Sequence, residues 1–80
     1  MFYSYILKSE KDGKFYYGST QNIEERLKKH NKGDVQSTKS RRPMILQFIE
    51  PHDSRSLAFQ REKFYKSIDG YIFLKKQEII

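Results

Sequence analysis

The chain has 80 residues, a length that fits one small domain spanning residues 1–80. Cysteine is absent, which excludes disulfides and thiolate zinc sites, so stability must come from a core in which six Phe and six Tyr dominate. Sixteen Lys and Arg against ten Asp and Glu give a net charge of +6. That charge is compatible with a polyanionic partner such as a nucleic acid, and also with ordinary solubility.

Signals for membrane insertion or secretion are missing from the sequence. No apolar stretch approaches the roughly 20 residues that a membrane-spanning helix needs. The N-terminus lacks the basic region and the long apolar core of a signal peptide, and its pattern predicts a strand from the second residue. We therefore expect a cytoplasmic protein with no membrane partner.

The first 20 residues predict an antiparallel β-hairpin. Residues 2–8 alternate between two faces and are rich in residues that favour strands. Residues 11–14 have the composition of a turn, and a second strand begins at Phe15.

The register of this hairpin decides whether two of its tyrosines can share a site. A four-residue loop over residues 10–13 places Tyr5 opposite Gly18 and diagonal to Tyr16. A two-residue loop separates the two tyrosines by four positions, about 13 Å at ~3.3 Å per residue. Both registers put the tyrosines on one face of the sheet, and we favour the first.

A helix and a third strand follow the hairpin. Asn22 stands three residues before Glu25, an arrangement that resembles a capping box and predicts a helix to about Asn31, stopped by Gly33. After a polar loop, residues 44–49 form a nearly unbroken apolar run, which predicts a short strand covered on both faces.

The C-terminal third is predicted to be helical. Asp53 or Ser54 caps a helix to about Ser67, Asp69-Gly70 breaks it, and residues 71–79 form a short last helix. The buried stripe of the longer helix is expected to contain Leu57, Ala58, Phe64, Tyr65 and Ile68. The order ββαβα(α) predicts an α/β (α+β) domain with a small, mainly antiparallel three-stranded sheet flanked by helices.

Five side chains with chemical potential stand where these elements could bring them together. Tyr5 and Tyr16 lie on the two hairpin strands, Arg26 and His30 lie four apart on one face of the first helix, and Glu62 lies beside the apolar stripe of the second. Each has an ordinary structural explanation as a half-buried strand tyrosine, a helix-end cation or part of a solvated charge run. Their joint spacing is more informative than any one of them.

That spacing closely resembles the GIY-YIG nuclease domain, especially its small stand-alone bacterial members and the N-terminal nuclease domain of the excinuclease C subunit. Tyr3-Ser4-Tyr5 stands at the first motif and Tyr16-Tyr17-Gly18 at the second, with ten residues between them. Arg26, His30 and Glu62 match the arginine, the histidine or tyrosine, and the glutamate of the family. The resemblance covers about residues 2–68.

The chain departs from the family pattern at a few positions. Tyr3 replaces the glycine of the first motif, and Ser4 and Tyr17 stand where aliphatic residues are usual, changes that concern strand packing more than chemistry. Some relatives carry a lysine three residues after the second-motif tyrosine to help activate it, and here that residue is Ser19. The resemblance therefore does not fix the general base.

The resemblance implies a metal-dependent endonuclease that hydrolyses DNA phosphodiester bonds, with a role in DNA repair or recombination by analogy. It implies one Mg²⁺ or Mn²⁺ ion at Glu62, bound weakly because one carboxylate leaves Mg²⁺ to water and phosphate oxygens. We assign Arg26 to the scissile phosphate, Tyr5 to accepting the proton of the attacking water, and Tyr16 to orienting it. The site is expected to lower the phenol pKa, with His30 as a second proton carrier or phosphate ligand.

Four basic residues are expected to bind the nucleic-acid backbone without reading sequence: Lys32, Lys39, Arg41 and Arg42. The main alternative is a non-catalytic nucleic-acid-binding module with the same fold, and a third is a protein-interaction domain whose charge is incidental. The sequence specifies neither the natural substrate nor the oligomeric state; a monomer would nick one strand, whereas a dimer could cut both.

Overall fold

Three antiparallel strands form the sheet in a computed structural model that describes residues 1–80. The central strand β1 (Phe2–Ser9) pairs with β2 (Phe15–Thr20) on one side and with β3 (Met44–His52) on the other. Both β2 and β3 are therefore edge strands. The predicted small antiparallel sheet is confirmed.

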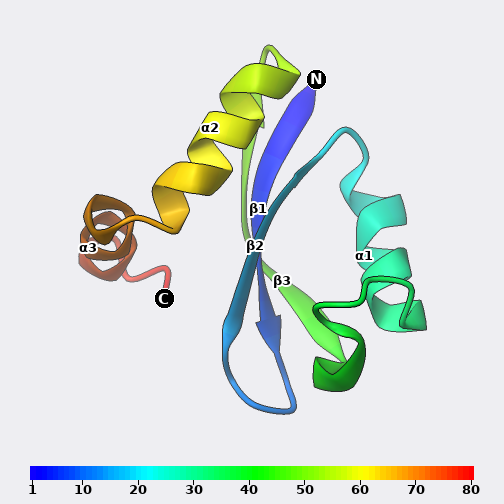
Figure 1. The fold of residues 1–80 in the computed structure, drawn as a ribbon. Helices are drawn as coiled ribbons and strands as arrows, with labels where there is room; N and C mark the ends of the chain where they lie inside the picture. Colours follow the sequence, from blue (N-terminus) through cyan, green and yellow to red (C-terminus); the bar gives the residue numbers. More distant parts are fainter.

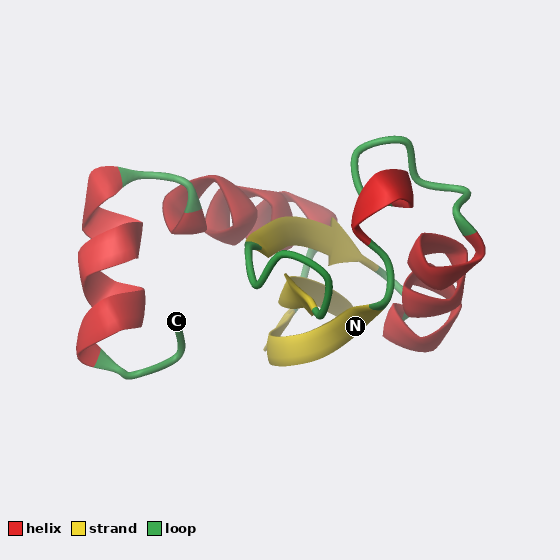
Figure 2. Ribbon diagram, turned by 90° about the horizontal axis from the view of Figure 1, so that it is seen from below, coloured by secondary structure: helices red, strands yellow, loops and turns green.

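The helices cover both faces of this sheet. α1 (Ile23–Lys32) lies on one face, and α2 (Arg55–Tyr65) and α3 (Ile68–Lys76) lie on the other (Figure 1). Figure 2 shows the same layers from below, with the strands between α1 and the other two helices. A short 3₁₀ turn, η1 (Lys39–Arg41), precedes β3. The predicted order ββαβα(α) is confirmed, and no helix combines the length and apolar character needed to cross a membrane.

The hairpin has the register that the four-residue loop predicts. Ser9 N–H donates to the Lys14 carbonyl at 2.9 Å, and Tyr5 pairs with Gly18. Glycine is required at position 18 because a Cβ there would lie 2.5 Å from the Tyr5 hydroxyl oxygen. The absence of a side chain on β2 thus makes room for the phenol of β1.

The ends of α1 follow the capping residues that the sequence supplies. The Asn22 side chain accepts a hydrogen bond from the Glu25 N–H at 3.2 Å, and Gly33 closes the helix with a φ of 87°. Asn31, in the last turn, both donates to the Met44 carbonyl and accepts from the Met44 N–H. These two bonds attach the end of α1 to the start of β3.

Three of our expectations for the second half of the chain are wrong. β3 is a longer edge strand whose Ile45 and Leu46 are exposed, because an apolar run does not reveal that its strand lies at the edge of the sheet. Asp69-Gly70 does not break a helix but lies in the first turn of α3, which begins at Ile68 after its cap, Ser67. Leu57 and Ile68 are exposed instead of buried, whereas Ala58 and Tyr65 are buried as predicted.

Alternate residues of β1 anchor separate cores on the two faces. On the α1 face the buried cluster comprises Tyr5, Leu7 and Met44, and on the other face it comprises Ile6, Tyr65 and Leu74. A polar network adjoins the second cluster: Ser4 bonds both His52 and Tyr65 at 2.8 Å, and Tyr65 donates to Glu50. Each face therefore carries its own arrangement of polar groups.

Candidate active site

A chain of buried hydrogen bonds begins at Tyr5. The Tyr5 hydroxyl lies 3.1 Å from His30 Nε2, and His30 Nδ1 lies 2.8 Å from the Thr38 hydroxyl. All three side chains are almost completely buried. Arg26, one turn before His30 on α1, donates from Nε to the Tyr5 oxygen at 3.4 Å. The structure thus brings together Tyr5, Arg26 and His30, as predicted from their spacing, and adds Thr38, which we did not predict.

One assignment of protons satisfies every contact in this chain. Arg26 donates to Tyr5, and Tyr5 donates to His30 Nε2. The Nδ1–H of His30 then donates to Thr38, whose hydroxyl donates to the Val35 carbonyl at 3.4 Å. A neutral imidazole protonated on Nδ1 is the form this assignment requires, since Nε2 must accept.

Tyr16 completes the cluster from β2. Its ring lies 6.4 Å from that of Tyr5 and 4.9 Å from that of His30, with an interplanar angle of 65° to the imidazole. Unlike Tyr5, it is only half-buried. Tyr16 is therefore the tyrosine of the pair whose side chain is in contact with solvent.

The protonation of this cluster follows from its burial. Burial raises the pKa of Tyr5 to about 12, and the hydrogen bond from Arg26 only partly opposes this effect. Burial, assisted by the positive charge of Arg26, lowers the pKa of His30 to about 4. Both side chains are neutral near pH 7, so the expected lowering of the phenol pKa is wrong for Tyr5 in the free protein.

The pKa of His30 makes stability depend on pH. Between pH 6.5 and about 4 the unfolded chain holds a proton on this histidine and the folded protein does not, so unfolding free energy falls as pH falls through that window. We expect a loss of as much as about 3 kcal/mol, at ~1.4 kcal/mol per pKa unit. Urea unfolding at pH 7, 5.5 and 4.5 measures this change in the free energy of unfolding.

The two histidines of the chain provide a matched control for this measurement. His30→Gln should abolish most of the pH dependence, whereas His52→Gln, on the other face of the sheet, should retain it. An equal dependence in His30→Gln and the native protein would show that His30 is not the group responsible.

Glu62 approaches the cluster from α2, around the edge strand β2. Its carboxylate accepts from the Ser19 hydroxyl at 2.9 Å and from Lys66 Nζ at 3.0 Å. The side chain is 15% exposed, and its negative charge is among the smaller causes, after burial, that raise the pKa of Tyr5. Ser19, which we noted only as the replacement of a lysine, therefore orients the glutamate.

At Glu62 the protein offers a divalent cation one carboxylate, with the Ser19 hydroxyl beside it. No group of three or more His, Cys, Asp or Glu side chains is gathered in the structure. A site with one carboxylate matches Mg²⁺, which takes water and phosphate oxygens as its other ligands. Lys66 would have to move aside, which its 53% exposed side chain permits.

The four residues predicted to bind the nucleic-acid backbone differ in solvent exposure and in their contacts within the protein. Lys32, Lys39 and Arg42 are exposed. Lys39 and Arg42 line an open pocket beside η1. Arg41 instead pairs with Asp12 at 3.1 Å and donates to a backbone carbonyl of β2. The role of Arg41 in the structure is therefore to fasten the hairpin turn to η1.

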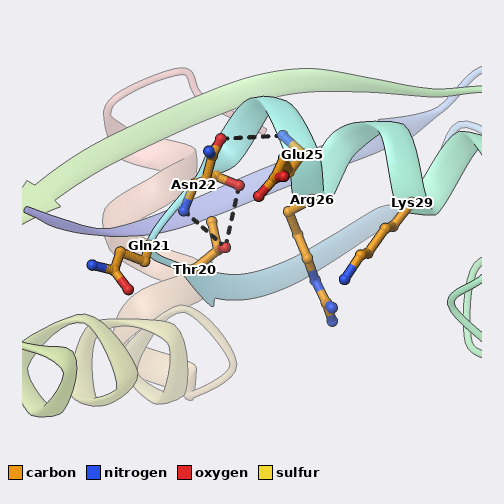
Figure 3. Close-up of a pocket in the computed structure, with 6 residues that line it drawn as sticks. All are labelled: Thr20, Gln21, Asn22, Glu25, Arg26 and Lys29. Carbon is orange, nitrogen blue, oxygen red and sulfur yellow. Dashed lines mark hydrogen bonds between the residues drawn. The ribbon is translucent and has the colours of Figure 1, made fainter.

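A second open pocket lies at the start of α1, next to the Tyr5 cluster. Arg26 and Lys29 project from the helix in the same direction there (Figure 3). All of its lining residues are polar or charged: Thr20, Gln21, Asn22, Glu25, Arg26 and Lys29. Two adjacent cations on one side of a helix suit the binding of phosphate groups.

Comparisons with known proteins identify the family of the chain. Residues 1–70 match the family model described as the GIY-YIG catalytic domain. A UPF0213 protein of Staphylococcus saprophyticus is 46% identical over 74 residues, covering 91% of this chain and 89% of the relative. The solution NMR structure of a UPF0213 protein from Bacillus halodurans has a TM-score of 0.56 and 31% identity, covering 96% of this chain and 85% of that one.

Other relatives match over a shorter length. A UPF0213 protein of Bacillus cereus is 36% identical over 59 residues, which are 72% of this chain and 62% of the relative. The match therefore spans less than two thirds of the length of that relative. Taken together, the matches show that the chain belongs to the GIY-YIG family, a superfamily of nuclease domains, and confirm the resemblance found in the sequence.

Proposed function

We propose that the protein is a metal-dependent endonuclease that hydrolyses DNA phosphodiester bonds. The observation that supports this most directly is the hydrogen-bonded cluster of Tyr5, Arg26 and His30, with Glu62 held at the adjoining sheet edge. A cation for the phosphoryl oxygens, a phenol for the attacking water and a carboxylate for a metal are the groups that this reaction requires.

Arg26 is the residue proposed to hold the scissile phosphate. Its Nε is bound to Tyr5, so the guanidinium plane is oriented while its terminal nitrogens are left to meet two phosphate oxygens. Its charge stabilises the extra negative charge that develops on the phosphoryl group. Lys29 and the pocket beside it extend the same cationic surface along the substrate backbone.

Arg26→Lys is expected to lower kcat about a hundredfold, comparable to the loss of one preorganised donor to a developing anion. Lysine keeps the charge but lacks the planar fork that bonds Tyr5 through Nε and meets two phosphate oxygens with parallel donors. Single-turnover cleavage measures the change. Lys29→Ala is the matched control, and should raise KM with little change in kcat. A native kcat in Arg26→Lys would mean that the positive charge at this position suffices without the guanidinium group.

The role of proton acceptor, which the sequence favoured for Tyr5, is here proposed for Tyr16. Tyr5 is buried, neutral and bound to both Arg26 and His30, so it positions the arginine. Tyr16 is half-buried and packs against the imidazole ring, so it is the better candidate to orient the attacking water and, as the phenolate, to take its proton. His30 holds the Tyr5 hydroxyl in place through Nε2.

Glu62 is proposed to hold the single divalent ion, Mg²⁺ or Mn²⁺. When bound, the ion would supply Lewis-acid neutralisation of the phosphoryl oxygens and lower the pKa of water. The contribution of the protein is to hold the carboxylate beside β2 through the Ser19 hydroxyl. Exposed Lys32, Lys39 and Arg42 would contact phosphates farther along the DNA.

Cleavage of supercoiled plasmid tests this function. We expect nicking with Mg²⁺ or Mn²⁺ that stops with EDTA and weakens as salt rises. Salt-sensitive DNA binding without cleavage would instead support a binding module that keeps the fold. If the protein does not bind DNA even at low salt, the remaining alternative is a protein-interaction domain whose positive charge is incidental. A role in DNA repair or recombination and a cytoplasmic location stay predictions.

A further inference from the structure

A row of cations with one aromatic ring lies along α2 and its C-cap, beside Glu62. Its members recur at intervals of three or four residues, which places them on one side of the helix. They are Arg55, Phe59, Lys63 and Lys66, here called the α2 strip. All four are exposed, and the Phe59 ring is 51% exposed.

The strip is continuous with the candidate active site. Glu62 lies one turn after Phe59 and one turn before Lys66, whose ammonium bonds the carboxylate at 3.0 Å. The ammonium of Lys63 lies 5.3 Å from the centre of the Phe59 ring. A ligand phosphate at Glu62 would therefore lie within one helical turn of Phe59 and its neighbouring cations.

The composition of the strip identifies what it would bind. A single exposed phenylalanine is ordinary on a protein surface and by itself indicates nothing. A ring set among three cations, with Glu62 as the acid on the same side of the helix, matches the two parts of a nucleotide. The cations complement the phosphates, and the ring offers its face to a base.

We propose that the α2 strip binds an unpaired nucleotide next to the scissile phosphate, with its base stacked on Phe59. This inference rests on the proposed nuclease function and narrows its substrate class. Bases within a duplex are already stacked on each other and cannot lie flat on a protein ring, so the substrate has a single-stranded stretch or a branch at the cut site.

The lack of tryptophan in the chain allows a direct test. Phe59→Trp places one fluorescent ring at the strip. Tyr71→Trp is the matched control, because Tyr71 is 54% exposed and has Lys75 Nζ 5.7 Å from its ring centre, yet lies on α3. Each variant is titrated in EDTA with a single-stranded oligonucleotide and with a blunt duplex, while the anisotropy of a dye on the DNA reports binding.

We expect the single strand to quench the indole fluorescence of Phe59→Trp and not that of Tyr71→Trp, and the duplex to quench neither. Phe59→Ala should weaken single-strand binding at least about fivefold, the loss typical of removing one stacking side chain, and Phe59→Tyr should restore it. Tyr71→Ala should have no effect. Because Phe59 and Tyr71 are both exposed, none of these variants is expected to unfold the domain.

Three results would overturn the inference. DNA binding without quenching in the Phe59→Trp variant, or with equal quenching in the Tyr71→Trp variant, would show that the strip does not stack on a base but would leave the nuclease proposal standing. Quenching of the Phe59→Trp variant by the duplex as strongly as by the single strand would contradict the requirement for an unpaired nucleotide. No binding of either DNA at low salt would remove the proposed function together with this inference.

Discussion

Glu62→Ala is expected to abolish metal-dependent cleavage, with a fall in kcat of at least about a thousandfold, the scale of losing an essential electrostatic group. No group of three or more His, Cys, Asp or Glu side chains is gathered that could hold the ion in its place. DNA binding in EDTA should be unchanged or tighter, because the substitution removes a negative charge close to the phosphate. Plasmid nicking gives the rate, and fluorescence anisotropy gives the affinity.

A matched variant separates the role of this carboxylate from its charge. Glu24→Gln removes one negative charge from the exposed surface of α1 and should leave cleavage within about twofold, as expected for a screened surface charge. Purified in parallel, Glu62→Ala also reveals contamination by a host nuclease. Cleavage by Glu62→Ala at the native rate would show that the ion is held elsewhere or is not required.

Gly70→Ala is expected to destabilise the protein by about 3 kcal/mol or more, at the upper end of the usual cost of overpacking. A Cβ at position 70 would lie 1.7 Å from the Phe64 carbonyl oxygen and 2.9 Å from the Tyr65 Cα. These are backbone atoms of α2, so α3 would have to move as a body. Leu74, which packs with Ile6 and Tyr65, would be drawn out of the core.

Thermal unfolding followed by circular dichroism measures this effect, at about 4–8 °C per kcal/mol for a domain of this size. Gly13→Ala is the control, since nothing lies within 4 Å of its Cβ and only its φ of 71° opposes the substitution. We expect that variant to lose about 1 kcal/mol. A Gly70→Ala variant as stable as Gly13→Ala would mean that the two helices separate without cost.

The sequence predicted the first half of the domain better than the second, for physical reasons. In the hairpin, one turn length fixes every cross-strand pair, so placing Tyr5 opposite Gly18 required only a choice between two registers. Asn22 and Gly33 set the ends of α1 through local geometry. Both kinds of information lie within a few residues along the chain.

The errors arose where contacts between distant elements decide the outcome. The apolar run in β3 gave no sign that Ile45 and Leu46 lie at the edge of the sheet. Gly70 resembled a helix breaker, although its missing side chain serves a close approach between helices. The same limit applies to the site. Thr38 is an ordinary loop residue in the sequence, and only the fold brings its hydroxyl within hydrogen-bond distance of His30.

The residues of the candidate site are synthesised in two groups, one early and one late in the chain. The hairpin and α1 carry Tyr5, Arg26 and His30, and these can come together once β3 has emerged to receive Asn31. The carboxylate arrives later, since the Ser19–Glu62 bond closes a loop of 43 residues. Pairings between distant residues form slowly. We therefore expect a nascent chain to form the phosphate-binding cluster before the Glu62 carboxylate, proposed to hold the metal ion, reaches its place.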